Sequence, residues 1–178
     1  MTDHEADLRA ACGGDPEALD RVLRTLWPRA FRLALGITQD RATAEDAAQD
    51  ALVLVAGRLG SLRDPLAYPA WSGRIVVNAA TAALRRLRRH APLVDIGAAP
   101  RFEDLAAERL DLLRALETVP LWLRVPLVLR YVDGMTSREI GFALNAPAAT
   151  IRFRLALARR RLAAALDRSD PALQENFA

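Results

Sequence analysis

Apolar residues recur along this chain at the three- and four-residue spacing of an α-helix, whereas alternation typical of strands never lasts beyond a few residues. A first apolar stripe begins at Leu19 and passes Trp27-Pro28, where a kink or a new helix start is expected because proline lacks an amide proton. Further helices are predicted over about Thr43 to Leu59 and Ala70 to Arg89. The pattern therefore predicts an all-α fold.

The helical spacing stops between His90 and Asp104, where the sequence contains two prolines and one glycine. A segment of about fifteen residues without a helical period is longer than the usual loop inside a compact domain. Apolar spacing resumes near Leu105. We therefore expect two small helical domains, residues 1–90 and 105–178, joined by a flexible linker over residues 91–104.

The second domain contains a pattern typical of a helix-turn-helix between Gly134 and Leu162. Thr136 and Glu139 have the spacing of a capping box, which starts a short helix. Asn145-Ala146-Pro147 ends that helix, because asparagine tolerates a left-handed turn and proline cannot continue the helix. A longer helix is predicted to follow and to run at least to Leu166.

The longer helix carries arginines on the faces that its apolar row leaves free. A duplex major groove admits one α-helix, and guanidinium groups read its base edges, so Arg152 and Arg154 near the helix start are the candidates for reading bases. A solvated αα-hairpin with a basic face is the alternative structural interpretation. Residues predicted to contact the groove or its phosphates are Arg138, Ala148, Ala149, Thr150, Arg152, Phe153, Arg154, Arg159, Arg160 and Arg161, with Arg130 as a further phosphate candidate.

Composition limits the function classes only in part. All 25 basic residues are arginine, which fits the codon usage of a GC-rich genome better than selection for DNA binding. The net charge is +3, although residues 2–20 hold six acidic residues against Arg9. A single cysteine, Cys12, excludes an intramolecular disulfide and favours a reducing cytoplasm. The longest apolar run, Ala51 to Ala56, is far shorter than the roughly 20 residues that span a bilayer, so no membrane insertion is expected.

Candidates for chemistry are few. His4 and His90 lie far apart in the sequence, and Cys12 has no neighbouring cysteine or histidine at a metal-ligand spacing. No phosphate-binding glycine motif is present, and no nucleophile, base and orienting group can be assembled from the sequence. We therefore expect no metal, no cofactor and no enzymatic activity.

Three stretches together resemble the extracytoplasmic-function (ECF) sigma factors, the smallest sigma subunits of bacterial RNA polymerase. The first is the acidic stretch Ala44 to Leu52, AEDAAQDAL. The second begins with Tyr68-Pro69-Ala70-Trp71, continues through Arg74-Ile75 and Asn78, and ends in a basic tail. The third joins Val119 to Tyr131 with the helix-turn-helix. The resemblance covers nearly the whole chain.

The resemblance implies a promoter-specificity subunit that binds core RNA polymerase and promoter DNA, and that an anti-sigma factor commonly restrains. Residues 1–90 would be sigma domain 2, which binds the clamp helices of the largest polymerase subunit and recognises and melts the minus-ten element, with a flipped base held in the loop Gly60 to Pro69. Residues 105–178 would be sigma domain 4, which binds the flap of the second largest subunit and the minus-thirty-five element.

The resemblance also assigns residues within the first domain. The charged residues of this domain also have a purely structural explanation that needs no partner. The helix dipole favours carboxylates near a helix N-terminus and basic side chains near a helix C-terminus. Trp71 is expected to belong to the core. The residues that match the polymerase-docking surface are Glu45, Asp46, Gln49 and Asp50, and those that match DNA contacts are Arg74, Asn78, Arg85, Arg86, Arg88 and Arg89.

The chain departs from the family pattern at five positions. Val77 replaces the usual Arg and Ala82 the usual Asp, which removes polar groups from the predicted melting helix. Gly141, Asn145 and Phe153 replace the usual Ala, Gly and Ser in the helix-turn-helix. Two alternative functions remain: a helix-turn-helix regulator that acts without polymerase, and a sigma-like adaptor that does not open promoters.

Overall fold

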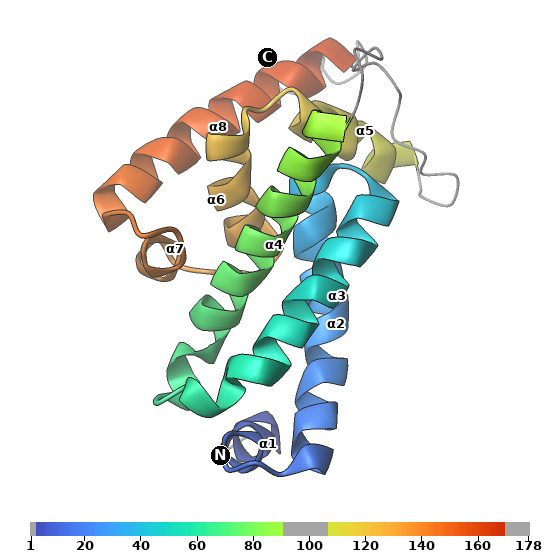
Figure 1. Cartoon of the computed structure of the whole chain (residues 1–178). Coiled ribbons are helices and arrows are strands. Elements are labelled where there is room, and N and C mark those ends of the chain that lie inside the picture. The colour runs from blue at the N-terminus through green and yellow to red at the C-terminus, as the bar shows by residue number, and fades with distance from the viewer. Residues whose placement is uncertain (1–2, 91–106, 170–178) are drawn as a thin grey trace.

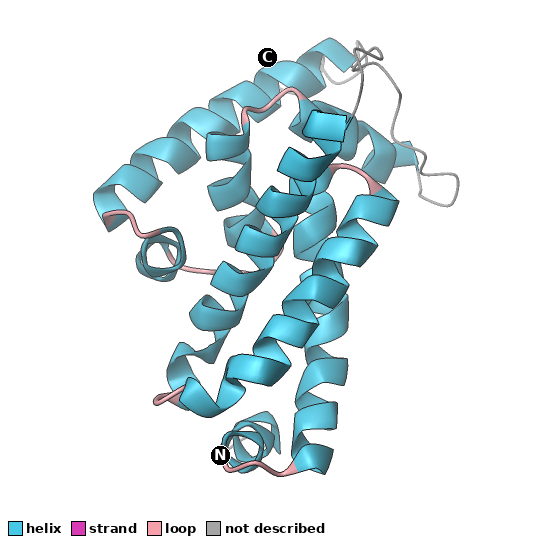
Figure 2. Ribbon diagram, viewed as in Figure 1, coloured by secondary structure: helices cyan, strands magenta, loops and turns pink. Residues whose placement is uncertain are grey.

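The computed structural model describes the backbone of residues 3–90 and 107–169, and the side chains of residues 4–87 and 112–166. Within these ranges every regular element is helical, as Figure 2 shows. The expected all-α class is therefore confirmed. The predicted linker, residues 91–104, lies outside the described residues, and the limits of the two predicted domains stay a prediction.

The N-terminal helical domain is built on three long helices that lie side by side (Figure 1). The middle one in sequence, α3 (Arg41–Arg58), has four fully buried alanines, Ala44, Ala47, Ala48 and Ala51. Their small side chains allow the other two long helices to approach closely. The elements of this domain are α1 (Asp3–Cys12), α2 (Pro16–Thr38), α3 (Arg41–Arg58), the short 3-10 helices η1 (Leu59–Ser61) and η2 (Pro65–Ala67), and α4 (Tyr68–His90).

The C-terminal region folds around its longest helix, α8 (Ala148–Ser169), which packs against the three other helices of this region. Ile140, Ile151, Leu155 and Ala158 are buried between them, which confirms the predicted apolar row of the helix-turn-helix. The elements of this region are α5 (Ala107–Glu117), α6 (Leu121–Tyr131), α7 (Ser137–Leu144) and α8 (Ala148–Ser169).

The structure differs from the predicted elements at the N-terminal end. No new helix starts after Trp27-Pro28, because α2 continues through Pro28 although proline cannot donate the bond to the carbonyl four residues before it. Leu26 and Ala30, on either side of Pro28, are buried and hold the helix against the core. Helix α1 was not predicted at all, and it buries Leu8 against this end of the domain.

The two helical regions share one continuous hydrophobic core. Helix α6 packs against α2, and α7 packs against α4. The contact between α2 and α6 is close, since a Cβ atom added to Gly36 would lie 2.9 Å from a methyl carbon of Val128. Two domains were expected from the sequence, but a packed contact between them was not.

Candidate nucleic-acid interface

The helix-turn-helix begins with the capping box that the sequence predicts. The Glu139 amide donates to the Thr136 hydroxyl oxygen at 3.3 Å, and the Thr136 amide donates to the Glu139 carboxylate at 2.7 Å. The turn that follows α7 uses Asn145, whose backbone is left-handed with φ of 50°. Its amide bonds to carbonyl oxygens of α7, so this short helix is fixed at both ends.

The capping box should make stability depend on pH. Hydrogen bonds from the side chain and the backbone of Thr136 hold the pKa of Glu139 below its ordinary value of 4.5. The folded state therefore favours the carboxylate, so the stabilisation is complete above about pH 4.5 and is lost as the pH falls below that value. We expect Glu139→Gln to unfold with a weaker pH dependence in this range and Thr136→Ala to lose about 1 kcal/mol at neutral pH. Urea unfolding followed by circular dichroism measures both effects, and unchanged pH profiles would contradict the role of Glu139.

Gly141 in α7 is required by the turn between the two helices. A Cβ atom at this position would lie 2.6 Å from the Ala146 carbonyl oxygen, and that backbone atom cannot move aside without distorting the turn. The Ala146 amide donates back to the Gly141 carbonyl at 2.9 Å, which holds the two segments together. Gly141, which stands where the family usually has alanine, therefore occupies a site where the Ala146 carbonyl leaves no room for a Cβ atom.

Gly141→Ala should destabilise the chain, although alanine is favoured over glycine in a helix by about 1 kcal/mol. The matched control is Gly57→Ala in α3, where an added Cβ atom would meet nothing within 4 Å and the helical preference should raise stability. Urea unfolding compares the two variants. Equal stabilisation by both would contradict the close approach.

The start of α8 presents a mixed polar and aromatic face. Arg152 and Phe153 are exposed, and the Phe153 side chain is 66% accessible. Arg154 is half-buried. Of the other residues predicted to contact DNA in this region, Ala148 and Thr150 are half-buried. The exposed ones are Arg138, Ala149, Arg159, Arg160 and Arg161. Arg130 is also exposed, and it donates to the Met135 carbonyl at 2.9 Å.

Helix α4 presents the predicted minus-ten residues on one face. Arg74, Asn78 and Arg85 are all exposed, and their spacings of four and seven residues place them in one row along the helix. Val77 lies in the core at 6% exposure, whereas Ala82 is exposed. The side chains of Arg88 and Arg89 lie outside the described residues.

The predicted polymerase-docking residues lie along α3. Asp46, Gln49 and Asp50 are exposed, and Glu45 is half-buried and paired with Arg41 at 3.0 Å. Asp50 also pairs at 3.0 Å with a predicted DNA contact on α4, Arg86, across a surface groove. Both side chains of that pair are 54% exposed, so the pair contributes little to stability.

The loop before α4 is stiffened and backed by aromatic residues. The Asp64 carboxylate accepts from the Leu66 amide at 2.9 Å, and Leu66 itself is 79% exposed. Behind the loop, the ring centroids of Tyr68 and Trp71 are 6.2 Å apart, and the half-buried Trp71 packs against the core as expected. Burial raises the pKa of the Tyr68 hydroxyl to about 12, against a smaller lowering by the charge of Arg29.

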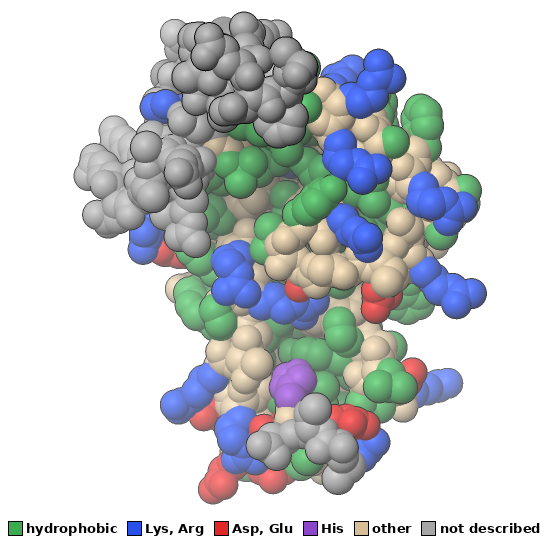
Figure 3. Space-filling model, turned by 180° about the vertical axis from the view of Figure 1, so that it is seen from behind, with side chains coloured by type: hydrophobic (Ala, Val, Ile, Leu, Met, Phe, Trp, Pro, Cys, Tyr) green, Lys and Arg blue, Asp and Glu red, His purple; other side chains and the backbone are tan. Residues whose placement is uncertain are grey.

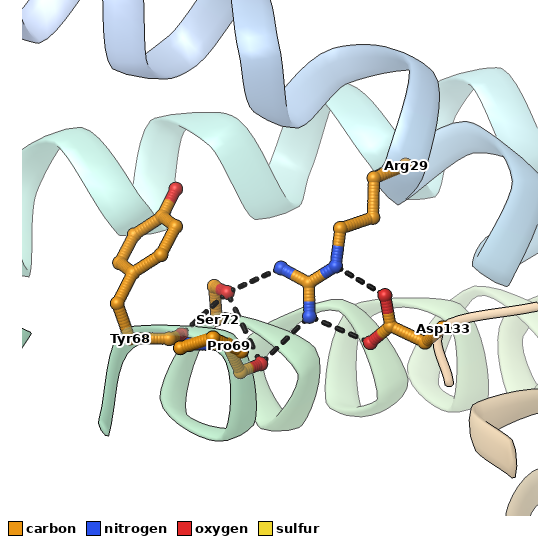
Figure 4. Close-up of polar contacts among 5 residues, drawn as sticks. All are labelled: Arg29, Tyr68, Pro69, Ser72 and Asp133. Atoms are coloured by element: carbon orange, nitrogen blue, oxygen red, sulfur yellow. Dashed lines mark hydrogen bonds and ion pairs between the residues drawn. The ribbon is translucent and has the colours of Figure 1, made fainter. Parts of the chain in front are cut away.

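One buried and two half-buried charged residues had no role predicted from the sequence. Arg124 is 5% exposed and donates to the carbonyl oxygens of Val119 and of Ile37, the latter at 3.0 Å. Arg29 and Asp133 form an ion pair between the two helical regions, drawn in Figure 4. Single arginines and aspartates carry no sequence signal that distinguishes a buried partner from a solvated one.

Charge is distributed unevenly over the surface. In Figure 3, arginine side chains are spread over the side of the molecule where α8 lies, while acidic side chains appear mainly at the end that holds α1 and the start of α2. Among the described residues, no group of three histidine, cysteine or acidic side chains lies together as a metal site would require. No helix in the described ranges is long and apolar enough to cross a membrane.

Family models of two sigma-70 regions match this chain. The model "Sigma-70 region 2" matches residues 22–90, and "Sigma-70, region 4" matches residues 109–162. The chain is 33% identical to the ECF RNA polymerase sigma factor SigM of Mycobacterium tuberculosis over 162 residues, which cover 89% of this chain and 83% of the relative. It is 28% identical to the RNA polymerase sigma-H factor of Pseudomonas aeruginosa over 179 residues, which cover 91% of each.

Two solved structures share the fold. CnrH, solved in complex with the cytosolic domain of CnrY, has a TM-score of 0.74 at 21% identity, and the match covers 93% of this chain and 98% of that one. The sigma factor RpoE of Bartonella quintana, solved with the anti-sigma factor NepR, has a TM-score of 0.70 at 20% identity, covering 83% and 96%. With both sigma regions matched and a relative at 33% identity along most of its length, this chain belongs to the ECF sigma factors of the sigma-70 family, non-enzymatic subunits that direct RNA polymerase to promoters.

Proposed function

We propose that this sigma factor divides its contacts among three surfaces: α3 for core polymerase, α4 with the preceding loop for the minus-ten element, and the helix-turn-helix for the minus-thirty-five element. The observation that carries the proposal is the exposure of the matched polar residues on each surface. Arg152 on α8, Arg74 on α4 and Asp46 on α3 all reach solvent, while their apolar neighbours fill the core.

The acidic face of α3 is proposed to dock on the clamp helices of the largest polymerase subunit. Asp46 and Asp50 supply negative charge one turn apart, with Gln49 beside them. Complementary charge speeds encounter and fixes the register of two surfaces more than it adds affinity. The second polymerase contact of the family, the flap of the second largest subunit, is proposed to involve the C-terminal region.

The minus-ten element is proposed to be opened by α4 and the loop from Gly60 to Pro69. Unstacking a base costs a few kcal/mol, and a loop that is already fixed by Asp64 and Pro65 loses little further entropy when it holds the base. Arg74, Asn78 and Arg85 are proposed to follow the strand beside the loop. The helix-turn-helix is proposed to place residues 148–154 in the major groove of the minus-thirty-five element.

An anti-sigma factor is a proposed further partner. The relative RpoE of Bartonella quintana was solved with such a partner, and its fold matches most of this chain. Since core polymerase and promoter DNA are the partners of a sigma factor, we place the protein in the cytoplasm.

Run-off transcription with purified core polymerase tests the proposed function. Transcripts that start at specific sites in the presence of this chain are the expected result. Association with core polymerase without any transcript would favour the alternative of a sigma-like adaptor, which Val77 in the core and Ala82 on the surface of α4 keep open. Sequence-specific duplex binding without polymerase association would favour the regulator that acts alone.

A further inference from the structure

The outer face of α8 carries an apolar stripe with an aromatic side chain at its centre. Ile151 and Leu155 are buried and mark the face of α8 that packs into the core. Phe153 lies two residues from each of them, which is about 200° around the helix, so it points away from the core. The residues that share this outer face at helical spacing, all of them exposed, are Ala149, Phe153, Ala156 and Arg160.

Arginines flank this stripe on both sides. Arg152 and Arg159 are seven residues apart, so they lie in one row beside the stripe. Arg154 and Arg161 form a matching row on its other side. No acidic residue occurs in residues 148–166, the part of α8 whose side chains the structure describes. Figure 1 shows α8 at the edge of the molecule, with this outer face turned away from the other helices.

An apolar centre between two basic rows fits the major groove of a DNA duplex. Two phosphate strands bound the groove, and their charge attracts the arginines on either side. The base edges form the floor of the groove and face the stripe between the two rows. A protein partner would need acidic surfaces on both sides of an apolar centre, whereas every duplex has this arrangement of charge. The charge pattern therefore favours DNA as the molecule that covers Phe153.

The ring of Phe153 restricts which base it can read. A phenyl ring has no hydrogen-bond donor or acceptor, and the apolar group that bases display in the major groove is the thymine 5-methyl. A ring placed over a G·C pair would cover polar groups without replacing their hydrogen bonds to water, which lowers affinity. Phe153 thus favours thymine by the contact that it makes and disfavours G·C by the bonds that it prevents.

The serine usual at this position in the family reads bases differently. Its hydroxyl can pair with base donors and acceptors alike, so it does not depend on a methyl group. Phe153 replaces that hydroxyl with an apolar surface, which the small side chains of Ala149 and Ala156 extend along the helix. These two alanines are seven residues apart, about 10 Å, which matches about three base-pair steps of B-form DNA.

We propose that Phe153 is a specificity-determining residue, which reads a thymine methyl in the upstream promoter element. The inference rests on the proposed placement of residues 148–154 in the major groove of the minus-thirty-five element. It adds the chemical group that is read there. Promoters read by this chain should accordingly differ at this position from those read by family members that carry serine.

The test uses holoenzyme assembled from the full-length chain and purified core polymerase. Duplexes that the holoenzyme selects from a randomised library should share an upstream element that contains thymine. Each thymine of that element is then replaced by deoxyuridine, which removes the 5-methyl and keeps the groups that pair with adenine. Affinity should fall about fourfold at the thymine that faces Phe153, as expected for one buried apolar carbon.

Two variants test whether Phe153 is the residue that senses the methyl. Phe153→Ser should bind the thymine and deoxyuridine duplexes equally, and its helicity by circular dichroism should be unchanged because the side chain is exposed. Phe142→Ser is the matched control, since it removes a ring of similar exposure from α7 of the same helix-turn-helix. This control should keep the fourfold difference between the two duplexes.

Three results would overturn the inference. A selected element that is insensitive to deoxyuridine, or a Phe153→Ser variant that keeps the wild-type difference, would show that Phe153 does not read a methyl, while the proposed function would stand. Loss of core-polymerase association by Phe153→Ser in a pull-down would show that this ring meets protein instead. If the holoenzyme selects no sequence at all, the proposed function fails, and the inference fails with it.

Discussion

Replacing both Asp46 and Asp50 with arginine should abolish association with core RNA polymerase. Both side chains are exposed on α3, and the double substitution changes the local charge from negative to positive on a face proposed to meet basic clamp helices. Like charges placed across an interface cost several kcal/mol, enough to remove detectable binding. Arg86, which pairs with Asp50, would add to the repulsion. Pull-down of the full-length chain with purified core polymerase measures the effect.

The control for this experiment changes the same number of charges elsewhere. Glu17→Arg with Asp20→Arg alters two exposed acidic residues of α2, outside the α3 face, and should leave polymerase association intact. The α3 variant should also retain binding to duplex DNA through its unchanged helix-turn-helix. Undiminished pull-down of the α3 variant would refute the docking face.

Replacing Arg152 or Arg154 with alanine should lower affinity for the cognate minus-thirty-five duplex by about 1–3 kcal/mol for each residue that reads a base. Arg152 is exposed near the start of α8 and free to enter a groove, whereas Arg154 is half-buried and would place its guanidinium along the helix surface. Fluorescence anisotropy with cognate and scrambled duplexes measures the affinity and the discrimination between the two sequences.

Arg159→Ala is the comparison, because Arg159 lies further along α8 and is proposed to hold phosphate. Its loss should weaken both duplexes alike and reduce the dependence of affinity on salt by about one charge. If Arg152→Ala and Arg154→Ala also weaken both duplexes equally, they hold phosphate and the assignment of base reading is wrong.

The parts of the fold that depend on interactions between residues close in the sequence could be predicted. The capping box of Thr136 and Glu139 spans three residues, and the left-handed turn at Asn145 depends on that residue and its neighbours. The apolar rows of α3 and α8 likewise follow from periodicity within one helix. The new helix start that was one of the two expectations at Pro28 is absent, because the packing of its buried neighbours outweighs the lost hydrogen bond, and periodicity does not report packing. The other expectation, a kink, stays a prediction.

The parts that depend on distant contacts could not be predicted. Arg29 and Asp133 are separated by 104 residues, and Arg86 and Asp50 by 36. The resemblance to ECF sigma factors implies that Asp50 meets polymerase and Arg86 meets DNA, but it does not indicate that the two side chains lie against each other. Gly141 could be recognised as unusual for a helix, but the carbonyl of Ala146 that excludes a larger residue is found only in the folded turn.

The hydrogen bonds of Arg124 show which contacts would be lost if the two helical regions separated. Of the bonds described for its guanidinium, those to Val119 and Glu117 stay within the C-terminal region, and one reaches Ile37 near the end of α2. If the regions separate, Arg124 moves with α6 and keeps its nearby acceptors, while water can replace it at the Ile37 carbonyl. The hydrogen bonds that hold Arg124 within the C-terminal region would therefore survive a separation of the two regions, and the C-terminal fold would not have to rearrange.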